Sequence, residues 1–529
     1  MTSRSIKQSG FRFSARAAVG MVVSAFAILY VISNPGNRSE ADDAFWFADR
    51  VETKSWRALP SFRHFLYLPL MRLVHSAARV MFPAVRSYDV MVGSSIVLGI
   101  GSIALLIIIA HRRFGMTTAA AVLSGVGFGL SYGFWRYSME AEVYALSAFT
   151  ALVAVWFALA RPAGARWTTI AVLAGALAFA SNALNATLVL VAIPLYFFAV
   201  SGWREASRQL LLQSLACALA LVGMVLFIQS DDGHAGGIPP IVDSPLELLA
   251  SPINAVTDVV TTNALNRFPI YLNLAARAAP GSVLDEERFV GQSIPLVVAA
   301  LSVVSLSGIA FLGIRAIFQA RRLRKTGAIS RLPPRGPLLL STVWLVTFSL
   351  AVAILGAAPE GWVLVLVPLW LSIGVAVIDP LARLGRSRGI YALIVLLGLH
   401  NLAGVLVMAK PETDFNQLKA AWLIENATQS DHIVTLQGAV FARYLAYYSE
   451  ADVTYVESDV ELGEVPGLLQ GLKDRPGRTF LTDDVFRDPE YFRSRGKDTS
   501  ALFAELVAPL RQESREVARS PAGAVFELS

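Results

Sequence analysis

Long apolar segments alternate with short polar ones along most of the chain. They are centred on residues 16–33, 88–110, 116–134, 143–160, 167–183, 186–201, 210–228, 291–314, 337–356, 362–379 and 390–409. Apolar runs close to the thickness of a bilayer predict membrane-spanning helices, so we expect roughly eleven spans, several of them short or tilted. The first run is long and no small-residue cleavage site follows it, so we interpret it as a retained helix.

The pattern changes after about residue 410, where charged residues become frequent and apolar ones alternate with polar ones. Strand-like stretches at 432–438, 452–458 and 478–484 are separated by helix-like stretches at 438–450 and 464–474. No glycine-rich nucleotide loop occurs among them. We therefore predict a mainly α, polytopic transmembrane domain over residues 1–409 and a small α/β domain over residues 410–529.

Composition agrees with this class and narrows the chemistry. The chain is 55% hydrophobic and 16% charged, and its mean hydropathy is +0.55, which is far from an ordinary soluble protein. The net charge of +6 comes mostly from basic residues between the apolar runs, so it predicts membrane orientation and no nucleic-acid partner. Cys217 is the single cysteine, which excludes an internal disulfide and a cysteine-based metal cluster.

Charge also predicts which side each loop faces. With a cytoplasmic N-terminus, every predicted inner loop is basic, including the segment 315–335. The acids then fall outside the cytoplasm, in the first outer loop at about 34–87, in the turn 134–146, in the loop 229–290 and at Glu360. The C-terminal domain lies on this outer side too.

The first outer loop opens with the acidic and aromatic stretch DDAFWFADRVE, residues 42–52. One interpretation is purely structural, because Ser39 or Asp42 can cap an interfacial helix and Trp46 can belong to an aromatic belt. The other is that these carboxylates are used, because acids at a bilayer edge are costly unless they are paired, solvated or functional. The sequence leaves both open for each single acid.

The turn FWRYSMEAEVYAL, residues 134–146, places a second acidic cluster on the same outer surface. The spans on either side are so short that Glu142 must begin the next helix at the membrane face. Glu142 is then a candidate functional acid, and pairing with Arg136 is the structural alternative.

Between these two clusters, residues 61–82 read as an amphipathic helix in the membrane interface, interrupted near Pro69. Arg63 and His64 stand at its start, close to the acids, where a cationic pair can hold a phosphate at headgroup depth. The alternative is an ordinary interfacial histidine and arginine.

Other features are structural in our interpretation. Gly125, Gly129 and Gly133 recur every fourth residue in the third span, as close helix packing requires. Asn182 and Asn185 at the end of the fifth span are typical of hydrogen-bonded helix ends.

These motifs, in this order, resemble the integral-membrane glycosyltransferases of the GT-C class, in particular the branch with protein O-mannosyltransferase-like proteins and related bacterial membrane proteins. The acidic stretch resembles the motif of the first outer loop, RHFLYLP the histidine-aromatic-proline segment after it, and FWRYSMEAEVYAL the aromatic turn ending in Glu-Val-aromatic. APEGWVLVLVP, residues 358–368, is similar to a late helix that ends in a proline.

The resemblance implies a sugar donor linked to polyprenyl phosphate, an outer-face active site in the bacterial inner membrane, and a first-loop aspartate as base. The spacing to Phe47 and Ala48 favours Asp43 as that aspartate, with Asp42 in reserve, since the Asp-Glu pair of the mannosyltransferases is Asp-Asp here. Glu142 would orient the acceptor, or a divalent metal if one binds; no cofactor is otherwise implied.

The residues themselves fit such a reaction. A carboxylate can deprotonate an acceptor hydroxyl, Arg63, His64 or Arg136 can stabilise the departing phosphate, and aromatic rings can flank the sugar. The candidate rings are those of Trp46, Tyr67, Trp135 and Tyr144. The acceptor is a glycan, lipid or protein of the envelope, and one-step displacement predicts inversion at the anomeric carbon.

Two other functions stay open. A transporter or flippase of a lipid-linked solute also carries acids near the membrane, although no charged residue falls mid-span here. A non-catalytic envelope assembly protein would use the outer domain for docking alone.

Overall fold

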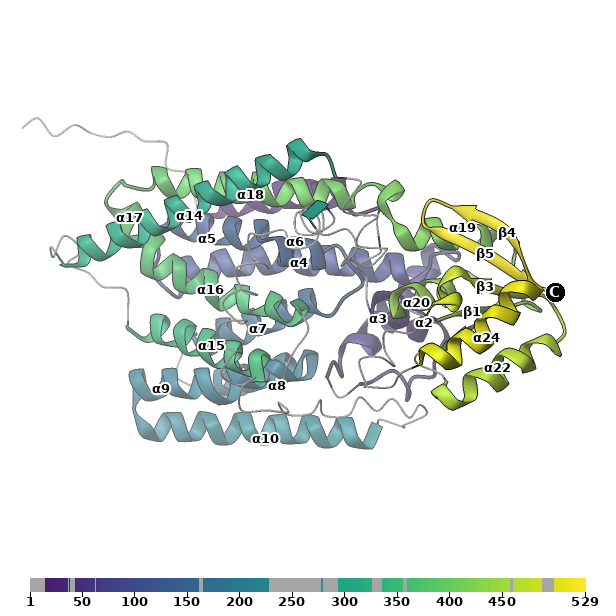
Figure 1. Ribbon diagram of the computed structural model, residues 1–529. Helices are drawn as coiled ribbons and strands as arrows, with labels where there is room; N and C mark the ends of the chain where they lie inside the picture. Colours follow the sequence, from purple (N-terminus) through teal and green to yellow (C-terminus); the bar gives the residue numbers. More distant parts are fainter. Residues whose placement is uncertain are drawn as a thin grey trace, which may run out of the picture.

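The computed structural model of the chain describes residues 15–36, 38, 43–61, 63–160, 165–227, 277–278, 294–325, 335–354, 359–436, 438–456, 460–487 and 499–529. Apolar helices form an elongated bundle, and a small sheet with its covering helices lies at one end of it (Figure 1). Two helices of the segment predicted to be the first outer loop, α2 (Ala44–Thr53) and α3 (Tyr67–Met81), lie between the bundle and the sheet.

The bundle contains all eleven predicted spans. Within the part of the chain that the structure describes, eight helical segments are long and apolar enough to cross a bilayer: α1 (Ala15–Ile32), α4 (Ser87–Arg112), Ala183–Ser201 ending in α9 (Ile193–Ser201), α10 (Trp203–Phe227), α14 (Leu296–Lys325), α15 (Arg335–Ile354), Gly361–Arg383 with α16 (Leu366–Ile373) and α17 (Asp379–Arg383), and α18 (Arg388–Met408). Three are shorter: α5 (Thr118–Leu130), α7 (Tyr144–Ala158) and α8 (Ala165–Ser181). Each overlaps one predicted apolar run, which confirms a polytopic membrane protein.

Small residues let the central helices approach one another closely. A Cβ atom at Gly125 would lie 2.2 Å from a side chain of α4, and one at Gly129 would lie 2.6 Å from side chains of α4 and α1. Their predicted packing role is confirmed. Gly133 lies elsewhere, in the short helix α6 (Tyr132–Tyr137), because α5 already ends at Leu130.

Helix α3 is amphipathic, as expected of residues 61–82. Its buried residues are Tyr67, Leu68, Met71 and His75, while Val80 is 83% exposed. The expected interruption near Pro69 is wrong, because Pro69 occupies the first turn of α3. An amide at that position would have no partner within the helix, so proline costs little there.

The C-terminal sheet has five strands in the order β2-β1-β3-β5-β4. Strand β1 (His432–Thr435) pairs in parallel with β2 (Asp452–Tyr455) and β3 (Thr479–Thr482), so the three predicted strands are confirmed. The antiparallel hairpin of β4 (Ser514–Ser520) and β5 (Gly523–Leu528) was not expected. It extends the sheet from the far edge of β3.

Among the described residues of this domain, the α-helices that accompany the sheet are α19 (Phe415–Asn426), α20 (Ala439–Tyr448), α22 (Val465–Lys473) and α24 (Ser500–Glu513). Helix α20 packs on α2 of the first outer loop. One cluster of buried apolar side chains runs from α2 and α3 through α20 into the sheet, with Phe45, Leu445 and Phe480 among its members. The C-terminal domain and the first outer loop therefore share a core.

Candidate active site

Aromatic side chains join the first outer loop to α20. The ring of Phe45 stacks on Tyr88 of α4 with centroids 4.8 Å apart, and Tyr444 meets it edge-on at 5.0 Å. Tyr448 approaches from the same helix at 5.7 Å. Such ring pairs add about 0.5–1.5 kcal/mol each beyond the area they bury. They hold α20 directly over the start of α2.

A polar junction beside these rings fixes the same contact. The carboxylate of Glu52 accepts hydrogen bonds from the Ser87 amide at 2.7 Å and the Tyr447 hydroxyl at 2.9 Å, and it pairs with Arg86 at 3.1 Å. Burial raises the pKa of Glu52, but these donors and the charge of Arg86 outweigh it and lower the pKa overall. Glu52 is therefore ionised, and its carboxylate holds the start of α4 and α20 against α2.

The first candidate base, Asp43, lies at the N-cap position of α2 but makes no capping hydrogen bond. Its carboxylate pairs instead with Arg443 of α20, Nη1 to Oδ1 at 2.5 Å. The Asp43 side chain is 48% exposed and that of Arg443 is 33% exposed. An exposed ion pair of this kind is worth little, about 1 kcal/mol or less, so a substrate can compete for either partner. Asp42, the reserve candidate, lies outside the described residues.

A second carboxylate, Glu140, sits in a buried charge cluster with Arg38, Arg136 and Tyr88. Arg136 forms an ion pair with Glu140 one helical turn away, Arg38 pairs with it at 3.3 Å, and the Tyr88 hydroxyl donates to it at 2.7 Å. The Glu140 side chain is 1% exposed. Burial lowers the pKa of Arg38, but the charge of Glu140, the interaction with Tyr88 and the hydrogen bond to Glu140 together outweigh burial and raise the pKa overall.

The buried charge cluster also reaches the C-terminal domain. The backbone amide of Arg38 donates to the Asp414 carboxylate at 2.7 Å, and the same carboxylate caps α19 by accepting from Gln417 at 2.9 Å. One arginine thus links the acidic turn of the bundle to α19, the first α-helix described in the C-terminal domain.

Glu142 is 5% exposed and directly precedes the N-cap of α7, close to where the sequence placed it. Its charge acts on Tyr67 of α3: burial is the largest cause that raises the pKa of the Tyr67 hydroxyl, and Glu142 is the next. The charge of the second acidic cluster therefore reaches the amphipathic helix α3.

Arg63 and His64 precede α3 and lie against the junction of α8 with the following turn. The Ala183 amide donates to the Arg63 carbonyl at 3.1 Å, and the Leu66 amide to the Ala180 carbonyl at 3.0 Å. The Arg63 side chain is exposed. Burial, followed by the charge of Arg63, lowers the pKa of His64 to about 4. At neutral pH Arg63 is therefore the charged member of this pair.

The four candidate rings occupy different surroundings. Trp46 is partly buried and carries the Arg50 guanidinium 4.7 Å from its ring centroid, and Tyr67 packs on Phe47 at 5.6 Å. Trp135 is buried in the bundle, where its indole N–H donates to Ser33 at 3.0 Å. Tyr144 is partly buried at the start of α7.

The structural interpretation of the two asparagines is confirmed. Asn182 accepts from the Leu184 amide at 2.9 Å, and Asn185 donates to Ser147 at 3.0 Å and to the Ala178 carbonyl at 3.0 Å.

Sequence reasoning missed the contribution of α20. Its residues Arg443, Tyr444 and Tyr447 all lie on the face that covers α2 and the start of α4. The signal was present in ARYLAYYSE, where an arginine and three tyrosines gather within one short helix. Within the described ranges, no group of three or more His, Cys, Asp or Glu side chains is arranged to hold a metal ion.

Comparisons with known proteins agree with this fold. The ArnT structure from Cupriavidus metallidurans bound to undecaprenyl phosphate matches with a TM-score of 0.57 and 13% sequence identity over 97% of this chain and 98% of that one. The oligosaccharyltransferase of Archaeoglobus fulgidus in the apo form matches with a TM-score of 0.50 and 11% identity over 90% of this chain and 70% of that one. Both are GT-C proteins, so this chain has the GT-C fold.

A family model adds a match in sequence. Residues 67–207 match the model of the protein O-mannosyl-transferase TMEM260 N-terminal domain. That range runs from α3 to the start of α10 and contains the turn with Glu140 and Glu142. No curated protein matches the sequence significantly. The expected resemblance to GT-C glycosyltransferases is confirmed.

Proposed function

We propose that this protein is a glycosyltransferase that moves a sugar from a polyprenyl-phosphate-linked donor to an envelope or secreted acceptor. The GT-C fold and the match to an O-mannosyl-transferase domain support this class of reaction. The observation that carries the proposal is the half-exposed carboxylate of Asp43, which pairs with Arg443 of α20 and does not cap its own helix.

Asp43 is the proposed base. As an acceptor hydroxyl attacks the anomeric carbon, the carboxylate takes its proton, the bond from that carbon to the phosphate oxygen breaks, and polyprenyl phosphate leaves. One base and one displacement give inversion at the anomeric carbon. Glu142, with Tyr67 beside it, is proposed to orient the acceptor, and Trp46 and Tyr144 to line the sugar.

The departing phosphate needs a cation. Arg63 is exposed at the start of α3, so it is the leading candidate, and the neutral imidazole of His64 would add a hydrogen bond. Arg136 is buried with Glu140, so we assign it, together with Trp135, to holding the turn in shape. A divalent metal is not required by this scheme.

The test uses the full-length protein purified in detergent with synthetic polyprenyl-phosphate sugars and an envelope extract as acceptor. We expect release of free polyprenyl phosphate that depends on the acceptor. A flippase would instead move the intact lipid-linked sugar across vesicles without cleaving it, and an assembly protein would do neither. Either of those results would replace the proposed activity.

The proposed orientation puts the N-terminus in the cytoplasm of a bacterial inner membrane and residues 410–529 outside it. Because Cys217 is buried, single cysteines can report on access. In intact cells an impermeant thiol reagent should label Glu450→Cys and spare Arg386→Cys, both of which are exposed positions. The reverse labelling would move the active face to the other side.

A further inference from the structure

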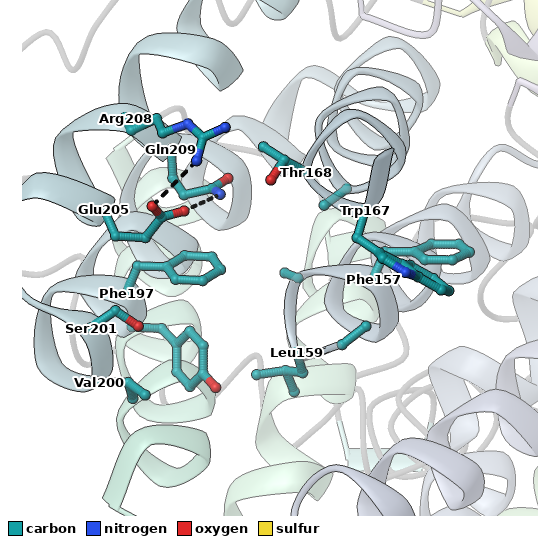
Figure 2. Close-up of a pocket in the computed structure, with 14 residues that line it drawn as sticks. Phe157, Leu159, Trp167, Thr168, Phe197, Val200, Ser201, Glu205, Arg208 and Gln209 are labelled. Atoms are coloured by element: carbon teal, nitrogen blue, oxygen red, sulfur yellow. Dashed lines mark hydrogen bonds and ion pairs between the residues drawn. The ribbon is translucent and has the colours of Figure 1, made fainter. Parts of the chain in front are cut away.

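A cavity of about 520 Å³ is lined by the end of α7, the starts of α8 and α10, and the end of α9. Helices α9 and α10 meet at the end of the bundle that lies away from the C-terminal sheet (Figure 1). Figure 2 shows that rings make up much of its wall; they are Phe157, Trp167, Tyr196 and Phe197.

One wall of the cavity is polar and comes from the first turns of α10. The Gln209 amide nitrogen donates to the Glu205 carboxylate at 2.9 Å, and Arg208 approaches the other carboxylate oxygen at 3.7 Å (Figure 2). Gln209 is 3% exposed, whereas the Arg208 side chain is 53% exposed. The amide and carboxylate are thus part of the cavity lining, and the guanidinium stands at its mouth.

The orientation of the Gln209 amide follows from its neighbour. Carboxylate oxygens accept hydrogen bonds, and the Gln209 amide nitrogen faces the Glu205 carboxylate. The amide oxygen is then left over, and it is buried without a hydrogen-bond partner among the described residues. Figure 2 shows this amide pointing from α10 toward Thr168 on the opposite wall. A buried acceptor without a donor costs about 1–3 kcal/mol, which a donating ligand would recover.

The mouth of the cavity borders the lipid-facing surface. Trp167 and Val200 line it and are 37% and 44% exposed, and the nearby Phe198 and Trp203 are 52% and 72% exposed. Large exposed apolar and aromatic groups at the end of membrane spans face the headgroup region. A ligand that enters here comes from the bilayer.

We propose that this cavity binds the headgroup of a phospholipid that bears a primary ammonium. The ammonium would donate to the Gln209 oxygen and the Glu205 carboxylate among the aromatic faces, which favour a cation. Its phosphate would meet Arg208 at the mouth. This second lipid site is separate from the proposed active site and does not depend on the proposed glycosyl transfer.

The test is native mass spectrometry of the full-length protein with phosphatidylethanolamine, phosphatidylcholine or phosphatidylglycerol added at equal concentrations. We expect one tightly held phosphatidylethanolamine per chain. The choline lipid has no N–H to donate and the glycerol lipid has no cation. The affinity of the protein for each should therefore be lower by at least about ten-fold.

Variants locate the site. Gln209→Leu and Glu205→Gln should each weaken the bound phosphatidylethanolamine about ten-fold or more, while Gln213→Leu, one turn further along α10 and outside the cavity lining, should leave it unchanged. Thermal unfolding without lipid checks that each variant is folded. Equal binding of the three lipids, or retention in both cavity variants, would overturn the proposal.

Discussion

Two acidic regions at the same end of the bundle differ in how their carboxylates are held. Glu140 in the buried charge cluster is 1% exposed and held by two arginines and a tyrosine hydroxyl. Asp43 at the start of α2 is 48% exposed, and its pair with Arg443 comes from an element some four hundred positions later in the chain. In the sequence both are acids predicted to lie beside a bilayer. The structure shows that they differ in how far their side chains are buried.

The difference teaches which acid can be used in catalysis. A buried carboxylate that is already held by several donors is closed to a substrate hydroxyl, and neutralising it would remove a counter-charge from buried arginines. A half-exposed carboxylate with one exchangeable partner can change that partner when substrate arrives. From this comparison we propose a stabilising role for Glu140 and a chemical role for Asp43.

The largest effect is expected at Asp43. Asp43→Asn keeps the size of the side chain but removes the basicity, so turnover should fall by about 10²–10⁴-fold, the usual share of a general base. Thermal stability should stay near that of the wild type, because the pair with Arg443 is exposed. Release of polyprenyl phosphate by the purified variant measures the first expectation. Near-normal turnover would transfer the role to Asp42.

Glu140→Gln tests the other half of the comparison. It leaves Arg136 and Arg38 without their shared counter-charge in a buried place, which costs about 3–5 kcal/mol of unfolding free energy. We expect a lower unfolding temperature in detergent and a smaller yield from the membrane. A variant as stable as the wild type with lost turnover would reverse the two assignments.

Much of the bundle was predictable because each span is determined by a pattern within a short stretch of the sequence. The apolar runs gave every span, and the glycine spacing at Gly125 and Gly129 gave a packing face. Pro69 was misjudged, because a proline's effect depends on whether it falls in the first turn or the interior of a helix. The hairpin of β4 and β5 was missed because β4, SREVARS, is mostly polar and partly exposed, so no apolar alternation marks it as a strand.

The site was predictable only in part, since its decisive contacts are long-range. The first-loop acids and the turn with Glu142 were found from their positions beside the bilayer. The partner Arg443 and the bond from Arg38 to Asp414 join segments hundreds of residues apart. No pattern within either segment indicates that pairing, so the division of labour between Asp43 and Glu140 required the structure.

His64 gives a pH test of the first outer loop. Its pKa is about 4 when folded, against an ordinary value of 6.5, so the unfolded chain binds the proton more readily. The contribution of His64 to the free energy of unfolding is fully present above pH 6.5 and decreases as the pH falls toward 4. The total loss is about 3 kcal/mol at most. Unfolding followed over this pH range should show the slope in the wild type and lose it in His64→Gln. An unchanged slope in the variant would assign it to other groups.

Arg63→Ala tests the proposed donor site beside it. Loss of a charge-assisted bond to phosphate costs roughly 1.5–3 kcal/mol, so the donor KM should rise or turnover should fall by at least about ten-fold. The exposed Arg57 is a matched control in the same loop, and Arg57→Ala should leave donor kinetics unchanged. Equal effects of the two substitutions would indicate general charge attraction and no defined phosphate site.

The smallest effect is expected at Asp49, on the same helix as Asp43. Six residues along an α-helix turn the side chain by about 240°, so Asp49 points away from the direction of Asp43. Burial is the main cause that raises the pKa of Asp49, and Asn keeps its shape without a charge to desolvate. Asp49→Asn should therefore change turnover by less than about two-fold and stability by less than about 0.5 kcal/mol. If Asp49→Asn lowered turnover as much as Asp43→Asn in the same assay, the negative charge of the whole helix, and not one positioned base, would be what the reaction needs.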